Sequence, residues 1–76
     1  MSPQEVLDEV RKIEEGLRNR NRSARSTRNR ADRAGRLGDA AEAHARAEAY
    51  AEAGRLVARL RAQVEADLVD RTEVGP

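Results

Sequence analysis

Residues 35–38 of this 76-residue chain read GRLG and separate two long stretches of helix-forming residues. Glycine readily adopts the left-handed backbone conformation that ends many helices, so Gly35 is expected to cap a first helix. Asp39, with Glu42 three residues later, predicts the N-cap and the acidic first turn of a second helix. Helices joined by so short a connection are antiparallel neighbours. The sequence therefore predicts a helical hairpin whose turn lies at residues 35–38.

The first helix is predicted to span about residues 3–34. Ser2, Pro3 and Glu5 have the arrangement of a capping box with proline in the first turn, which starts a helix. From there, apolar residues recur at alternating intervals of four and three residues, the seam spacing of a coiled coil. Toward the turn, the positions at this spacing hold small residues and one arginine. The seam predicted for this helix consists of Val6, Val10, Ile13, Leu17, Arg20, Ala24, Thr27, Ala31 and Ala34.

The second helix is predicted to span about residues 39–70, and a tail is predicted over residues 71–76. The first part of this helix alternates alanine with polar residues, an alternation that strands also show. Because alanine is the best helix former and is depleted in strands, a helix is the prediction. Leu56 is expected at the flank of the seam. The seam itself is predicted to consist of Ala43, Tyr50, Ala53, Val57, Leu60, Val64 and Leu68.

The predicted hairpin has an aliphatic end at the termini and an alanine-rich end at the turn. A chain of this length forms a single domain, residues 1–76, with a small core. It contains no cysteine, so no disulfide supports that core. Self-association or a partner is therefore expected. The predicted fold is an all-α, coiled-coil-like antiparallel hairpin that forms a homodimer, a four-helix bundle. The predicted oligomer interface consists of Val6, Val10, Ile13, Leu17, Tyr50, Val57, Leu60, Val64 and Leu68.

Eight arginines and one acid, Asp32, give residues 18–36 a net charge of +7, whereas the whole chain carries +1. In one interpretation, the arginines form a ladder of salt bridges to Glu42, Glu48 and Glu52 of the second helix, which would set the register of the hairpin. In two other interpretations, the arginines bind either the phosphates of a nucleic acid or the carboxylates of an acidic protein surface. The candidate binding residues are Arg18, Arg20, Arg22, Arg25, Arg28, Arg30, Arg33 and Arg36.

Binding to an acidic protein partner is the predicted function of this segment. The segment has no aromatic residue for base stacking, although a phosphate track on a nucleic acid remains the alternative. Tyr50 and Leu37 are expected to anchor a protein partner beside the arginines, since tyrosine is enriched at binding hot spots. The ordinary alternative for Tyr50 is a packing role in the seam. A third interpretation is a structural coiled-coil component of a larger assembly.

The sequence contains no pattern that predicts catalysis or a cofactor. It has no glycine-rich phosphate loop, no Ser/His/Asp set and no cluster of metal ligands. A two-helix hairpin also offers no concave pocket for a substrate. His44 and Glu48 lie one helical turn apart, but two ligands are too few for zinc, so an exposed histidine is expected. The chain is therefore predicted to be non-enzymatic, without cofactor, metal or small-molecule substrate.

The first ten residues, MSPQEVLDEV, lack the basic and apolar regions of a signal peptide, and no apolar run reaches the length of a membrane span. A cytoplasmic location is therefore expected. Residues 47–57 read AEAYAEAGRLV and follow a basic first helix. This arrangement resembles small, uncharacterised helical-hairpin proteins of actinobacteria and their phages. The resemblance implies a phage-encoded or mobile-element protein that acts by binding, in the host cytoplasm or in the virion.

Overall fold

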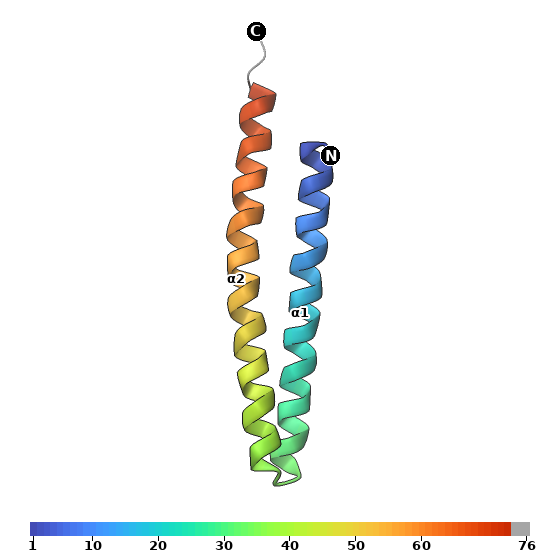
Figure 1. Cartoon of the computed structure of the whole chain (residues 1–76), viewed down its shortest axis with the longest axis vertical. Helices are drawn as coiled ribbons and strands as arrows, with labels where there is room; N and C mark the ends of the chain where they lie inside the picture. The colour runs from blue at the N-terminus through green and yellow to red at the C-terminus, as the bar shows by residue number, and fades with distance from the viewer. Residues whose placement is uncertain (74–76) are drawn as a thin grey trace.

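The computed structural model contains two long helices that pack side by side in opposite directions (Figure 1). Helix α1 spans Pro3–Arg33 and helix α2 spans Leu37–Glu73. The structure describes residues 1–73, and the side chains of residues 1–70. The molecule is a rod of 65 × 15 × 15 Å, in which α2 continues past the N-terminus of α1 (Figure 1). The all-α helical hairpin that the sequence predicts is confirmed.

The start of α1 is stabilised by the capping box that its sequence predicts. The Ser2 hydroxyl accepts a hydrogen bond from the backbone N–H of Glu5 at 3.2 Å. In return, the Glu5 carboxylate accepts one from the backbone N–H of Ser2 at 3.3 Å. Pro3 follows in the first turn, where a helix does not use the backbone N–H. The box thereby satisfies N–H groups that the N-terminus of a helix otherwise leaves unpaired.

The end of α1 is a Schellman motif built around Gly35, which has a φ of 72°. The Gly35 N–H donates to the Asp32 carbonyl at 3.1 Å, and the Arg36 N–H donates to the Ala31 carbonyl at 2.9 Å. The left-handed conformation that the sequence predicts for Gly35 is confirmed. These bonds reverse the chain within residues 34–36, which belong to neither helix.

Helix α2 begins earlier than the sequence predicted, at Leu37 instead of residue 39. The Schellman motif is complete at Arg36, whose carbonyl already accepts a helical hydrogen bond from the Ala40 N–H at 2.9 Å. Asp39 is therefore not the N-cap. It lies in the first turn of α2, where its negative charge still faces the positive end of the helix dipole. The turn is correspondingly shorter than the predicted residues 35–38.

Helix α2 also extends beyond its predicted end at residue 70. The predicted tail covered residues 71–76, but residues 71–73 continue the helix, and residues 74–76 lie outside the described residues. Within the described part of the chain, neither helix carries an apolar stretch of the length that crossing a membrane requires.

The core of the hairpin is narrow and changes in character along the rod. Near the turn it consists of alanines from both helices, whose small side chains let the two backbones approach closely. These buried residues are Ala24, Ala31, Ala40, Ala43 and Ala47. Near the termini, the larger buried side chains among the described residues are Leu7 and Val10, which are 4% and 7% exposed. Because buried apolar area contributes roughly 25 cal/mol per Å², a core with so few large side chains gives one hairpin little stability.

The seam between the helices is rotated away from the line of large apolar residues that predicted it. In α1, Glu14 and Asn21 take seam positions, whereas Ile13 is 54% exposed. In α2, Leu60 is 49% exposed, and the next residue, Arg61, contacts α1 instead. The predicted seam is therefore wrong at Ile13, Arg20, Thr27, Ala34 and Leu60, all of which are exposed.

Close packing of the alanine-rich end explains this rotation. The Schellman turn fixes the two helices against each other at one end, and the buried alanines then align them along a single heptad line. Continued from Ala24, that line runs through Leu17 and Val10 and takes in Asn21 and Glu14 between them. The larger aliphatic side chains are consequently displaced to one side of the seam.

Replacing Gly35 with alanine is expected to destabilise the protein by about 1–2 kcal/mol, because a β-carbon disfavours the left-handed conformation. Gly38 supplies the matched control, since it lies in α2 and nothing lies within 4 Å of a β-carbon built there. Gly38→Ala is expected to raise stability by up to about 1 kcal/mol. Chemical denaturation followed by circular dichroism measures both variants. Equal losses of stability in the two variants would contradict the special role of Gly35 in the turn.

Candidate functional site

An ion triad lies in the seam between mid-length and the termini. Arg61 of α2 donates through Nε to Glu14 of α1 at 2.7 Å and through Nη1 to Glu65 of its own helix at 2.7 Å. These hydrogen bonds, first that to Glu65 and then that to Glu14, raise the pKa of Arg61 above its ordinary value. The Glu14 side chain is only 13% exposed. The triad therefore lies between the helices and fixes α1 against α2 at this height.

Two more polar contacts cross the seam closer to the turn. Asn21 Nδ2 donates to the backbone carbonyl of Ala47 at 2.7 Å. Arg28 Nη1 lies 2.8 Å from His44 Nδ1, and the imidazole nitrogen accepts because a guanidinium group can only donate. Sequence reasoning missed all three contacts across the seam. The available signal was the seven-residue interval that places Glu14, Asn21 and Arg28 on one line of α1.

Glu14→Gln is expected to lower the midpoint of thermal unfolding, because the amide removes the charge that pairs with Arg61 in the seam. Glu15→Gln is the matched control, since Glu15 is an exposed neighbour without a polar contact among the described residues. Thermal unfolding followed by circular dichroism at one protein concentration compares the two variants. Midpoints that fall equally would show that the ion triad contributes nothing beyond the general effect of charge.

The eight arginines of residues 18–36 divide according to their contacts. Arg28 lies 3.8 Å from Asp32 in addition to its contact with His44, and Arg36 lies 3.8 Å from Asp39. The other six have no hydrogen bond or ion pair within the part of the chain that the structure describes. These six are Arg18, Arg20, Arg22, Arg25, Arg30 and Arg33.

Two of the three glutamates in the predicted ladder have partners on their own helix. Glu42 accepts a hydrogen bond from Arg46 at 2.9 Å, and Glu48 lies 3.8 Å from His44, each one helical turn away. Among the described residues, the salt-bridge ladder between the two helices is therefore not formed, and Glu52 has no ion pair. No third ligand joins His44 and Glu48 there to complete a metal site.

Four of the six unpaired arginines line one hollow on the outer side of α1 near the turn. The hollow has a volume of about 320 Å³, and Ser26 and Asn29 complete its lining. Arg22 is nine residues from Ile13, or about two and a half helical turns, so it lies on the side of α1 opposite Ile13. The set is named the arginine face and consists of Arg22, Arg25, Arg30 and Arg33.

An exposed aliphatic surface lies on the other side of the hairpin. Ile13, Leu56 and Leu60 are about half exposed, and they belong to the apolar lines that the seam leaves aside. Ile13 and Leu60 each directly precede a member of the Glu14–Arg61 contact, which places both on the same side of two antiparallel helices. The set is named the aliphatic face and consists of Val6, Ile13, Leu17, Leu56, Val57, Leu60 and Val64.

The remaining candidate residues lie in other places. Val10, from the predicted oligomer interface, is buried between the helices of its own chain, and Leu68 is half-buried near the termini. Arg20 lines a hollow beside Ile13, away from the arginine face. Leu37 is 75% exposed at the turn.

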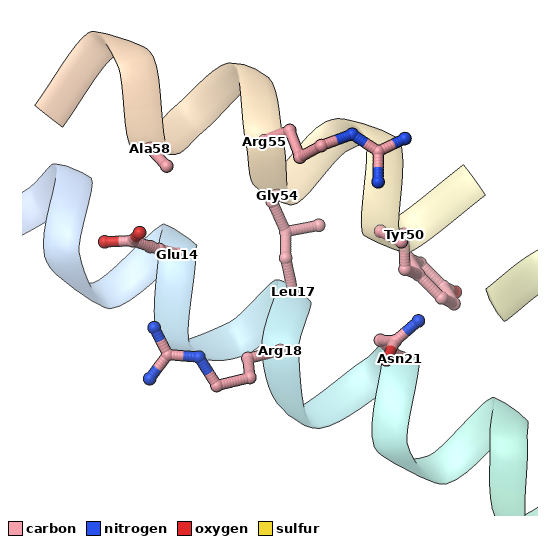
Figure 2. Close-up of a pocket in the computed structure, with 9 residues that line it drawn as sticks. Glu14, Leu17, Arg18, Asn21, Tyr50, Gly54, Arg55 and Ala58 are labelled. Carbon is pink, nitrogen blue, oxygen red and sulfur yellow. The ribbon is translucent and has the colours of Figure 1, made fainter. Parts of the chain in front are cut away.

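A hollow of about 240 Å³ lies between the two helices at mid-length. Figure 2 shows Leu17 pointing from α1 toward Gly54 of α2, with the side chains of Arg18 and Arg55 extending away from it. Nothing lies within 4 Å of a β-carbon built at Gly54, so this part of the hollow is open. Tyr50 is half-buried and lines the same hollow, which gives it a packing role in the seam.

The described side chains therefore present two separate surfaces of the hairpin. One consists of unpaired arginines near the turn, and the other consists of aliphatic residues nearer the termini. In comparisons with known proteins, no protein-family model matches the chain, and neither curated proteins nor solved structures give a significant match.

Proposed function

We propose that this chain is a non-enzymatic interaction module that binds an acidic protein surface through its arginine face. The observation that carries the proposal is that four guanidinium groups line one hollow without an acidic partner among the described residues. Neighbouring positive charges repel one another, so this arrangement favours a ligand that supplies negative charge. Arginine suits carboxylates in particular, because its planar group donates two parallel hydrogen bonds to one carboxylate.

The charge of the rest of the hairpin favours a protein over a nucleic acid as the ligand. Residues 18–54 carry a net charge of +4, whereas the remainder of the chain carries −3. A nucleic acid that followed the rod would meet this acidic remainder, which repels phosphates. A protein with a compact acidic patch would contact the arginine face alone. An acidic protein is therefore the ligand that we propose.

An apolar contact beside the arginines is part of the proposal. Exposed ion pairs contribute roughly 0–1 kcal/mol each, so four of them give at most about millimolar affinity. Leu37 is the large apolar residue exposed at the turn, next to the arginine-rich end of α1. A leucine side chain that becomes fully buried contributes roughly 1.5–3 kcal/mol. Leu37 is therefore the proposed anchor for the partner.

We also propose that two copies associate through the aliphatic face into a dimeric four-helix bundle. Each copy offers aliphatic side chains that its own fold leaves partly or largely exposed, while its own core holds few large side chains. Association would add the apolar layer that a single hairpin lacks. The centre of the arginine face lies roughly 20 Å along α1 from Ile13, so the face stays accessible in such a dimer.

A titration at two salt concentrations tests the proposed function. The probes are a short poly-L-glutamate peptide and a short DNA duplex of random sequence, each at about 50 mM and about 200 mM salt. Binding of poly-L-glutamate with little binding of the duplex supports an acidic protein partner. Tight duplex binding, with a logarithmic salt slope of about −0.9 for each phosphate contact, would favour a nucleic-acid ligand instead. An oligomer that binds neither probe would favour a structural role.

A further inference from the structure

We infer that the dimer is antiparallel and carries one arginine face toward each end of a single rod. The inference rests on the proposed dimer and specifies how the second copy lies on the aliphatic face. A second copy is the occupant because the same face on both chains is self-complementary, being aliphatic on each. Because the core of one hairpin contains few large side chains, burial of the aliphatic face stabilises both copies in the same way.

The aliphatic face covers only part of the hairpin, and its centre lies away from the arginines. Its residues run from Val6 to Leu17 on α1 and from Leu56 to Val64 on α2, so Ile13 is close to the centre. An interface between identical surfaces has a twofold axis at its centre. The arginine face is centred about fourteen residues from Ile13, or roughly 20 Å along the helix at 1.5 Å per residue.

The charge distribution decides between the two orientations that such an axis allows. In a parallel dimer, the segments with a charge of +4, residues 18–54, lie side by side and repel each other. In an antiparallel dimer, they project in opposite directions. Charges arranged in this way select an orientation more than they add affinity.

The antiparallel arrangement has a consequence for binding. It separates the two arginine faces by roughly 40 Å along the rod, twice the distance of each from the axis. An acidic partner at one end leaves the other end free for a second partner, so the dimer bridges two acidic surfaces. On a particle that carries several acidic patches, the second contact forms at a high effective concentration and strengthens the first.

Distances between spin labels test the orientation. Because the chain has no cysteine, Ser26→Cys and Glu15→Cys each place one label on each copy, and every measured distance joins two copies. Both residues are exposed on α1. Ser26 is thirteen residues from Ile13, and Glu15 is two. Antiparallel packing therefore separates the paired labels along the rod by roughly 40 Å at Ser26 and by roughly 6 Å at Glu15.

The expected result is a pulsed-EPR distance that is clearly longer at Ser26 than at Glu15. Similar distances at the two sites, with a sedimentation mass of two chains, would mean parallel copies and would overturn the inference while the dimer stands. A mass of one chain, with no distance at either site, would overturn the proposed dimer and the inference with it. Circular dichroism of both labelled variants checks that each retains its helices.

Discussion

Leu60→Asp is expected to halve the molar mass of the protein in solution. Leu60 lies at the centre of the aliphatic face, so a twofold dimer buries two copies of it. Each replacement removes an apolar contact of roughly 1.5–3 kcal/mol and places a charge where water is excluded. The dissociation constant should therefore rise at least about a hundredfold, which corresponds to about 2.8 kcal/mol. Sedimentation equilibrium over a range of protein concentrations measures this constant.

Val69→Asp is the matched control for this prediction. Val69 is 53% exposed on the same helix, and it lies nine residues, or about two and a half turns, from Leu60. The control therefore adds the same charge on the opposite side of α2 and should leave the mass unchanged. Loss of mass in both variants would point to a general effect of charge. An unchanged mass in Leu60→Asp would exclude the aliphatic face as the interface.

The ends of α1 could be predicted from the sequence because each depends on a few neighbouring residues. The capping box at Ser2 and Glu5 and the left-handed Gly35 require contacts that reach no more than five residues along the chain. The start of α2 was predicted two residues too late for a related reason. Asp39 satisfies the rule for an N-cap in isolation, but the contacts of the preceding turn already end at Arg36.

The seam could not be predicted in the same way, because two heptad lines on α1 share half of their residues. Both lines contain Val10 and Leu17, but one adds Ile13 and the other adds Glu14. For α1 alone, the free energy gained by burying apolar side chains favours the line through Ile13. The close fit of alanines from both helices near the turn favours the line through Glu14. That choice depends on contacts between both helices. The apolar line that the seam leaves aside is the origin of the aliphatic face.

The positive charge of the candidate site was evident from the sequence, but its pairing was not. Arg28 falls on the heptad line of the seam and therefore meets His44 across it. Arg25, three residues earlier, falls to the side and has no partner within the described residues. Whether Arg25 or Arg28 meets α2 thus follows from the seam register, so the error in the seam limited the prediction of the site.

Replacing Arg25 and Arg33 together with glutamate is expected to weaken binding of poly-L-glutamate at least about thirtyfold. Both residues line the hollow of the arginine face and have no polar contact among the described residues, so the fold should be retained. Each replacement removes an attraction and adds a repulsion. With exposed pairs at roughly 0–1 kcal/mol each, about 2 kcal/mol of binding free energy is lost in total. Titration at low salt measures the change.

Arg11→Glu combined with Arg59→Glu is the matched control, because it changes the net charge equally at exposed positions outside the arginine face. If binding followed total charge alone, both double variants would lose the same affinity. A loss specific to Arg25 and Arg33 would locate the ligand on the arginine face.

The variant with glutamate at positions 25 and 33 should keep the molar mass of a dimer. Leu60→Asp should keep its arginine face intact but should have the molar mass of one chain. Binding and association can therefore be removed separately, because the residues for each belong to separate surfaces of the hairpin.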